Sequence, residues 1–350
     1  MSDTPSRNDL ARSERSAGHA APADSGQRPG TRKLRRWRIA LVSLASVFAL
    51  VAAVAVGGVL VLNHLASGIR RIPVTFAKLA VADQPVGRHS GQAMTVLITG
   101  AGISPAGAAT AGPSGLIMLL HINANHQAGG VVSIPPQAVV PVPGRGSMQI
   151  ENALSSGGAS LLVQTVEQLT RVQIQHYARI DLRHVANVVD AVGGVDVVLP
   201  APTTSFGYTF HAGTNHLNGA AALDYARQPS LTEAGRVLRQ QSLIRAVLSK
   251  IANNHLLINP VTTYHVLSAL TAMLTVDSNF TNSELAALAS ELKSLNSGAG
   301  TYVTAPARTT AGQLFLDRRI SDRLWEAIRQ DSIAAFAKKY PSTVTPQAVP

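Results

Sequence analysis

Cysteine is absent from this 350-residue sequence, and aromatic and charged residues are scarce. Without cysteine the chain has no disulfide framework and no cysteine-ligated metal site, which suits an exported protein. Aromatic residues make up 4% and charged residues 14%, whereas hydrophobic residues make up 46%, enough for a sizeable core. The net charge of +11 would suit a nucleic-acid partner, but no DNA-reading motif accompanies it, so we predict no nucleic-acid binding.

The N-terminal residues 1–38 have the composition of a disordered tail. Residues 1–30 are rich in Ser, Pro, Gly and Ala and have almost no large apolar side chain, so they cannot bury enough surface to fold. Five basic residues follow within residues 32–38. We expect a cytoplasmic tail that ends in this basic cluster.

Residues 39–62 form a long apolar run without any charge. At about 1.5 Å per residue a helix of this length crosses a bilayer core of about 30 Å. The run is longer than the apolar part of a typical signal peptide, so an uncleaved anchor is predicted in preference to a secretion signal. The basic cluster before it predicts a single-pass membrane protein with a cytoplasmic N-terminus and an extracytoplasmic main domain.

Residues 91–340 have the pattern of one globular domain, with a linker or an added strand region over 63–90 and a frayed C-terminus over 341–350. Apolar runs predict strands over 95–99, 116–122, 131–134, 177–180 and 195–199. Helices are predicted over 160–169, 184–192, 217–223, 261–274 and 282–295. The alternation of strands and helices predicts an α/β fold with a mixed central sheet covered by helices on both faces.

Arginines are concentrated between residues 222 and 245. Arg236, Arg239 and Gln240 stand at i, i+3 and i+4, so one helical face presents them together, and Arg227 ends the preceding segment. Guanidinium groups bind phosphate bidentately, so this group of residues indicates a site for a di- or polyanion. The alternative is a solvated helix face with scattered ion pairs.

Few acidic residues balance these arginines. Asp224 and Glu233 are the local acids, and they leave the positive charge under-compensated.

Other sequence signals are weaker. His121 and His126 could suggest a metal, but no acid is near them in the sequence, so we expect a structural or exposed role for both.

Several short motifs occur in a fixed order between residues 94 and 250. They are Ser133-Ile-Pro135, Val188-Val-Asp-Ala-Val-Gly-Gly-Val-Asp-Val197, His216-Leu-Asn-Gly219, Tyr225-Ala-Arg227 and Gly235-Arg-x-x-Arg-Gln-Gln241. In this series the chain resembles the LytR–CpsA–Psr (LCP) family of membrane-anchored envelope proteins. The resemblance implies a polyprenyl (pyro)phosphate lipid carrier and a cell-wall polymer as partners. Members transfer the polymer from that carrier to peptidoglycan and hold the lipid tail in an apolar tunnel.

The resemblance also assigns roles to individual residues. It places Arg227, Arg236, Arg239 and Gln240 on positions that bind the pyrophosphate or support its binding. It makes Asp190 a fold position rather than a catalytic one, and likewise Asp196.

The chain departs from the family pattern at the positions that usually hold the metal and part of the pyrophosphate. The residues found there are Gly102, Pro113-Ser-Gly115, Pro136-Gln137, Gln149, Glu151 and Pro229. The sequence therefore lacks the carboxylates that usually hold the metal, and without them magnesium would be held only through a bound pyrophosphate and water. Glu151 or Glu233 could substitute as a ligand. No catalytic residue is assigned.

The sequence thus predicts a membrane-anchored envelope protein that binds a polyprenyl (pyro)phosphate-linked glycopolymer and transfers it to the cell wall. The alternative is a catalytically inactive lipid-binding or scaffold protein that modulates active relatives, because the carboxylates are missing. Whether the chain is an enzyme stays open. A role in transcription attenuation is opposed by the predicted topology, which places the globular domain outside the cell.

Overall fold

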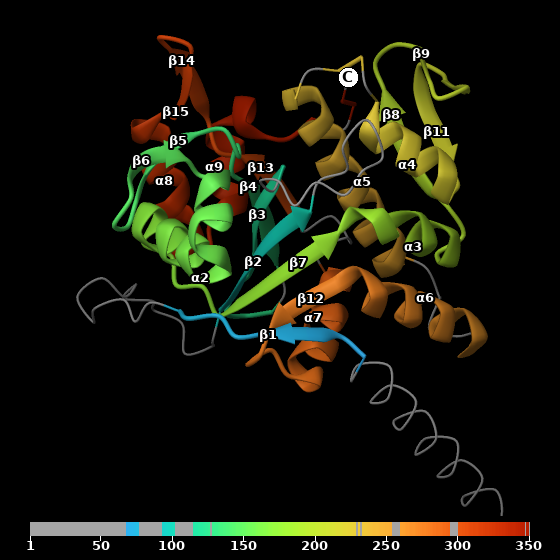
Figure 1. Cartoon of the computed structure of the whole chain (residues 1–350), viewed down its shortest axis with the longest axis horizontal. Coiled ribbons are helices and arrows are strands. Elements are labelled where there is room, and N and C mark those ends of the chain that lie inside the picture. The colour runs from blue at the N-terminus through green and yellow to red at the C-terminus, as the bar shows by residue number, and fades with distance from the viewer. Residues whose placement is uncertain are drawn as a thin grey trace, which may run out of the picture. The chain divides into compact units, whose positions relative to one another are not determined.

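The structure, a computed structural model, describes residues 68–349 with internal gaps (Figure 1). The gaps are residues 77–92, 102–114, 127, 229, 232, 254–259, 295–299 and 347. The predicted tail over 1–38 and the apolar run over 39–62 lie outside the described residues. Within the described part of the chain, no helix is long and apolar enough to cross a membrane.

A seven-stranded mixed sheet forms the centre of the domain, in the order β1-β12-β7-β2-β3-β4-β13. Its strands are β1 (Arg70–Ile72), β2 (Met94–Ala101), β3 (Leu116–Ile122), β4 (Gly129–Ser133), β7 (His176–Asp181), β12 (Leu274–Asp277) and β13 (Gly300–Thr304). Three pairs are parallel, namely β1 with β12, β2 with β7 and β4 with β13, and the others are antiparallel. The mixed central sheet predicted from the sequence is therefore confirmed.

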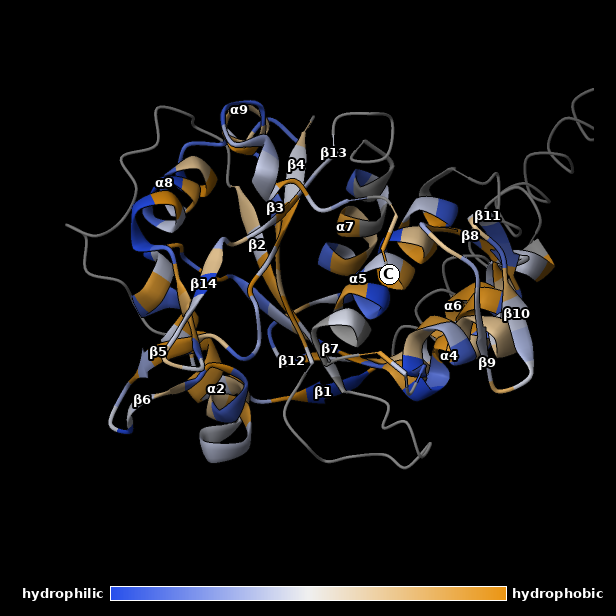
Figure 2. Ribbon diagram, turned by 90° about the horizontal axis from the view of Figure 1, so that it is seen from above, coloured by the Kyte–Doolittle hydropathy of each residue, from blue (hydrophilic) through white to orange (hydrophobic). Residues whose placement is uncertain are grey.

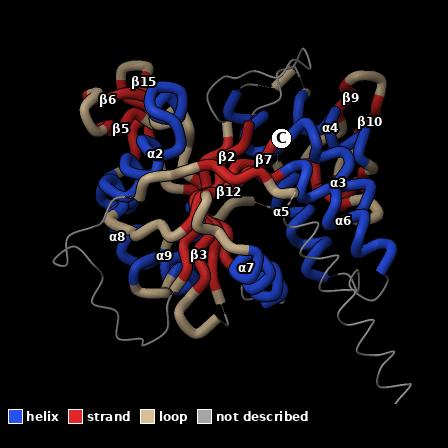
Figure 3. The backbone as a smooth tube through the Cα atoms, turned by 60° about the horizontal axis from the view of Figure 1, so that its bottom comes forward, coloured by secondary structure: helices blue, strands red, loops and turns tan. Residues whose placement is uncertain are grey.

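Helices pack on both faces of this sheet (Figures 1 and 3). One face carries α3 (Val185–Ala191), α4 (Gly219–Arg227), α5 (Glu233–Asn253), α6 (Pro260–Met273) and α7 (Asn282–Ser294). The opposite face carries α2 (Glu151–Thr170), α8 (Arg318–Arg329) and α9 (Ile333–Lys339).

The apolar run of β3 explains why both faces are covered. All seven of its residues are buried. Successive side chains of a strand point to opposite faces, so Leu116, Met118 and Leu120 pack against one set of helices while Ile117 and Leu119 pack against the other. Figure 2 shows the hydrophobic strands at the centre of the fold, between helices with hydrophilic outer turns.

Four two-stranded ribbons and two short 3₁₀ turns complete the described elements. The ribbons are β5 (Val139–Val142) with β6 (Gly146–Gln149), β8 (Val195–Leu199) with β11 (Gly213–Leu217), β9 (Thr203–Ser205) with β10 (Tyr208–Phe210), and β14 (Ala307–Thr310) with β15 (Gln313–Leu316). The 3₁₀ turns are η2 (Leu182–His184) and η5 (Pro341–Thr343).

Two helices differ from their predicted bounds. Residues up to Leu217 belong to β11, and α4 begins only at Gly219, where the Asn218 side chain accepts a hydrogen bond from the amide of Ala221 at 2.9 Å. Arg227 therefore ends a helix. Helix α2 begins at Glu151, earlier than predicted, with a kink at Gly157 and Gly158, whose backbone angles are not helical.

Both ends of the globular region pair with strands that are distant in the sequence. In the segment predicted as a linker or an added strand region, residues 70–72 form β1 and pair with β12. At the C-terminus, expected to fray, Val344 bridges to Val303 and the Val349 amide donates to the Val198 carbonyl at 3.3 Å. The Val349 side chain is buried. The C-terminal segment is held by pairing with the edges of distant strands. The sequence of this segment alone does not predict such pairing.

Candidate functional site

Helix α4 is fixed against α3 at its first residue. A Cβ atom at Gly219 would lie 2.3 Å from the Ala186 carbonyl oxygen, so only glycine allows this close approach. The Gly219 amide also donates to the Asp190 carboxylate at 2.7 Å. Asp190 thus has a structural role, and Asp196 is an exposed residue that pairs with His216 at 2.7 Å. This anchoring fixes where the C-terminal end of α4 lies.

Arg227 lies at that end of α4 with its side chain partly exposed. Its Nη2 atom lies 2.6 Å from Oδ1 of Asp224, one turn earlier in the helix. The guanidinium carbon is also 4.3 Å from the ring centroid of Phe206, at the tip of the β9–β10 hairpin. A positive charge in the last turn is favoured by the helix dipole. Arg227 is therefore held by a carboxylate and by its place in the last turn of the helix, and its guanidinium lies beside an aromatic ring.

Arg239 of α5 is buried and is only 2% exposed. Its guanidinium lies over the Tyr225 ring, with the central carbon 4.6 Å from the ring centroid, and Nη1 donates to Oε1 of Gln228. Burial lowers the pKa of Arg239 and raises the pKa of the Tyr225 phenol. The buried cation is thus bound to the residue that ends α4.

Gln228 connects this arginine to the β9–β10 hairpin. The side chain is 1% exposed, and its amide nitrogen donates to the hydroxyl oxygens of Thr203 at 2.6 Å and Ser230 at 2.9 Å. Its amide oxygen meanwhile accepts from Arg239. One buried amide therefore links α4, α5 and the hairpin.

The remaining predicted residues are placed less completely. Gln240 is buried, and its amide nitrogen lies 3.5 Å from the Ala226 carbonyl oxygen in α4. Its Oε1 atom is buried without a hydrogen-bond partner among the described residues. Arg236 belongs to α5, but its side chain lies outside the description. The structure thus brings Arg227, Arg239 and Gln240 to the end of α4, with Arg239 and Gln240 buried rather than on a solvated face.

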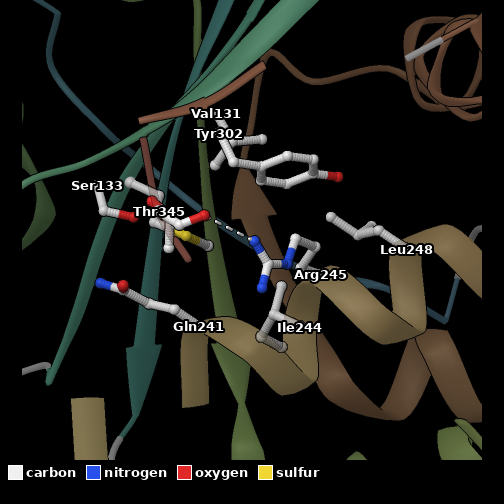
Figure 4. A pocket seen from close by; sticks show the side chains of 9 residues that line it. Val131, Ser133, Gln241, Ile244, Arg245, Leu248, Tyr302 and Thr345 are labelled. Carbon is white, nitrogen blue, oxygen red and sulfur yellow. Dashed lines mark hydrogen bonds between the residues drawn. The ribbon is translucent and has the colours of Figure 1, made fainter. Parts of the chain in front are cut away.

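A narrow pocket lies farther along α5, between this helix and the sheet (Figure 4). Its lining residues are Met118, Val131, Ser133, Gln241, Ile244, Arg245, Leu248, Tyr302 and Thr345. The cavity measures about 20 Å³, room for about one water molecule. Met118 of β3 lines this pocket, whereas the apolar segment 161–166 of α2 packs on the opposite face of the sheet.

Arg245 lines this pocket and was not singled out by the sequence. Its guanidinium donates to the carbonyl oxygens of Pro346 at 2.8 Å and Thr345 at 3.4 Å, and it lies 5.3 Å from the Tyr302 ring centroid. Figure 4 shows it reaching from α5 toward Thr345 and the ring. Burial lowers the pKa of Arg245 and raises that of Tyr302. Nothing in the local sequence indicates contacts that span a hundred residues.

The described positions that the family resemblance assigns to magnesium do not form a metal site. In the described part of the chain, no group of three His, Asp or Glu residues could hold a metal ion. Residues 136 and 137 are Pro and Gln, and Glu151 opens α2, which packs on the face opposite α4 and α5. The side chain of Glu233 lies outside the description. We therefore derive no chemical step through a metal.

The two histidines considered as metal ligands have no acid near them in the sequence, but the fold brings one acid to each. Nε2 of His121 lies 2.8 Å from Asp331, and Nδ1 of His126 lies 2.7 Å from Glu291. His121 is buried, and its other ring nitrogen is 2.9 Å from the Thr95 hydroxyl. Each acid is distant in sequence and is brought there by the fold, and the predicted structural role fits His121.

This arrangement offers two chemical environments along one helix. Near its N-terminal half, α5 lies against the arginine-bearing end of α4, and guanidinium groups are suited to phosphate. Farther along, the same helix and the sheet line a mostly apolar pocket. Such a combination is suited to an amphiphile with an anionic head and an apolar tail.

Comparison with known proteins gives one family. The model of the LytR_cpsA_psr family matches residues 72–322. A protein of Corynebacterium glutamicum named probable cell wall biosynthesis protein LcpB is 37% identical over 169 residues, which is 47% of this chain and 41% of that protein. A Bacillus cereus protein named polyisoprenyl-teichoic acid–peptidoglycan teichoic acid transferase TagU is 34% identical over 146 residues, or 41% of this chain and 48% of that protein. The match spans about half the length of these relatives.

Solved structures agree on the fold. The LytR-Csp2A-Psr enzyme from Actinomyces oris superposes with a TM-score of 0.58 at 20% identity, over 75% of this chain and 96% of that chain. At this identity the likeness concerns the α/β architecture.

Proposed function

Because this chain belongs to the LytR_cpsA_psr family, we propose that it is a membrane-anchored extracytoplasmic protein that binds a polyprenyl (pyro)phosphate-linked glycopolymer. One relative is named as a transferase of teichoic acid from a polyisoprenyl carrier to peptidoglycan, and another as a probable cell wall biosynthesis protein. These names support an envelope glycopolymer as the substrate class. The apolar run over residues 39–62 is the proposed anchor.

The observation that carries the proposal is that α5 contributes both to a group of arginines and to a mostly apolar pocket. The arginine group meets the end of α4, and the pocket lies beside Gln241 and Arg245, farther along the helix. A prenyl pyrophosphate needs both a cationic and an apolar contact. Since the pocket has room for only about one water molecule, we expect α5 and the sheet to separate when an isoprenoid tail enters.

The four predicted residues divide into two roles under this proposal. Arg227 and Arg236 contact the phosphate groups, because Arg227 is partly exposed and Arg236 belongs to the first half of α5. Arg239 and Gln240 are buried, so they support the site by fixing the ends of α4 and α5. In a transferase, these cations would neutralise charge on the phosphate that is transferred.

The alternative is a catalytically inactive lipid-binding or scaffold protein that modulates active relatives. It is favoured by the residues at the matched positions, where Pro136, Gln137 and Gln149 stand in place of charged family residues. Both versions require the same head-group contacts and differ only in turnover. Release of polyprenyl phosphate by the full chain, with magnesium and a peptidoglycan acceptor, would establish the transferase. Binding without release would establish the alternative.

Binding itself is tested with farnesyl pyrophosphate and the full-length chain in detergent. Each charge-assisted contact contributes about 1.5–3 kcal/mol, so we expect Arg227→Ala and Arg236→Ala to weaken binding at least about tenfold. Isothermal titration calorimetry measures the change. Arg323→Ala is the matched control, since that side chain is 67% exposed and belongs to α8 on the other face of the sheet. Equal affinities for the two site variants and the control would contradict the proposal.

A further inference from the structure

The β9–β10 hairpin carries an unusual residue at its tip. Ser205 pairs with Tyr208, so Phe206 and Gly207 form a two-residue turn, with φ angles of +48° and +83°. Turns of this kind favour Asn or Asp followed by Gly, because both central residues adopt left-handed conformations. A bulky aromatic residue in this region is an outlier. Because backbone strain of this kind is concentrated at functional sites, the contacts of Phe206 indicate what its function is.

The hairpin is firmly attached to the arginine site. Thr203 in β9 accepts the 2.6 Å hydrogen bond from Gln228, which also accepts a hydrogen bond from Arg239. In β10 the Phe210 ring is fully buried and lies 5.9 Å from the Tyr225 ring of α4, measured between centroids. The tip therefore occupies a defined position beside the end of α4.

Phe206 itself is 51% exposed. The guanidinium of Arg227 lies 4.3 Å from the ring centroid, so one face of the ring meets the cation. The exposure leaves the rest of the ring open to solvent beside a phosphate-binding side chain. Phe206 is thus an exposed aromatic surface next to the cation proposed to contact the head group.

We propose that Phe206 is a specificity-determining residue that stacks against the first sugar ring of the glycopolymer. This inference rests on the proposed function. In a polyprenyl pyrophosphate-linked polymer the first sugar is bonded directly to the phosphate, so a phosphate at Arg227 brings that sugar within reach of the neighbouring ring. The C–H face of a pyranose is apolar and packs on an aromatic face, while the cation holds the phosphate.

The test compares two probes on the full-length chain in detergent. They are farnesyl pyrophosphate and farnesyl pyrophosphoryl-N-acetylglucosamine, which differ by the sugar and by the one negative charge that the sugar replaces on the terminal phosphate, so Phe206→Ala isolates the contribution of the ring. We expect the parent chain to bind the sugar-bearing probe about threefold to tenfold more tightly, the range for aromatic stacking. In Phe206→Ala this preference disappears, while the affinity for farnesyl pyrophosphate changes less than about twofold. Phe206→Trp restores the preference, because it restores an aromatic face.

Phe206→Asn keeps the test independent of folding. Asn is suited to the first position of this turn, so the variant should retain the thermal midpoint and still lose the sugar preference. Equal binding of both probes by the parent chain would overturn the inference and leave the proposed function intact. Failure of both probes to bind would instead overturn the proposed function.

Two further results would also contradict the inference. If Phe206→Ala weakens both probes equally, Phe206 acts by positioning Arg227 and does not recognise the sugar. If the same variant keeps the sugar preference but loses binding to phosphatidylglycerol vesicles, the ring contacts a bilayer.

Discussion

Arg239 and Gln228 form a buried pair whose role is mainly to join elements. The arginine is 2% exposed, and its guanidinium is bounded by the Tyr225 ring and the Gln228 amide. Such a charge is costly to bury, which is why its pKa is lowered, and it is retained only where acceptors surround it. Arg239, predicted from its charge to bind phosphate, thus lies inside the fold and supports the proposed phosphate site from there.

Replacing Gln228 by Leu should reveal the strength of this connection. The variant removes the acceptor of Arg239 and the donor to Thr203, so the free energy of unfolding should fall by about 2–3 kcal/mol. Urea denaturation of the full chain measures it. Gln330→Leu is the matched control, because that side chain is exposed and donates to Glu326 one turn earlier, so the change should alter stability by less than about 0.5 kcal/mol. Equal stabilities for the two variants would contradict this role.

At the scale of single residues the sequence identified the cations but missed what holds them. Spacing alone grouped Arg239 with Gln240, and both do lie against α4. Phe206 carried no sequence signal, and Arg245 was only counted in the arginine-rich segment, because their partners are 21 and 100 residues away along the chain. Contacts of that range are decided by tertiary packing, which local patterns do not encode.

Among the secondary-structure elements, strands were easier to predict than helix ends. Continuous apolar runs correctly predicted β2, β3 and β4, because both faces of the sheet are covered. The helix predicted over 217–223 was shifted, because the cap at Asn218 fixes its start. The strand over 195–199 exists as β8, but it pairs in a separate ribbon with β11, a choice that periodicity does not determine.

The junction of β7 and β12 depends on one carboxylate. Asp277, fully buried, accepts hydrogen bonds from the amide of Tyr177 at 2.9 Å and from His176 at 3.3 Å, and from the Asn279 amide. Burial acts to raise the pKa of Asp277, but these hydrogen bonds outweigh it and lower the pKa overall. Because the pKa of Asp277 is lower in the folded chain than in the unfolded chain, where it is near 4, its ionised carboxylate stabilises the fold at any pH above about 4. This stabilisation is lost as the pH falls through the folded-state pKa.

Asp277→Asn should therefore remove an acid-sensitive part of the stability. At pH 7 the free energy of unfolding should be about 2–3 kcal/mol lower for the variant than for the parent. This difference should narrow as the pH falls below about 4. Urea denaturation across pH 3–7 provides the measurement, with the exposed Asp322→Asn as the control. A gap that stays constant from pH 7 to pH 3 would show that ionisation of Asp277 is not the cause.

At the scale of the whole molecule, the proposal combines an anchor with an extracytoplasmic domain. The family match covers residues 72–322, and the basic cluster and apolar run precede it. The positive-inside rule then directs the domain outward. Alkaline phosphatase fused to the C-terminus should be active, and a green fluorescent protein fusion at the same place should be dark.

Removing residues 39–62 should reverse both reporters, because the tail and the domain would then stay in the cytoplasm. A bright fluorescent fusion on the unaltered chain would place the domain inside the cell and contradict the envelope function.

The most direct test is an experimental structure of the full-length chain in detergent with farnesyl pyrophosphate bound. The account predicts that the phosphates contact Arg227 and Arg236 at the junction of α4 and α5. It also predicts that the prenyl chain enters between α5 and the sheet, widening the pocket beside Ile244 and Leu248. Phosphates bound away from both arginines, with α5 still closed on the sheet, would contradict it.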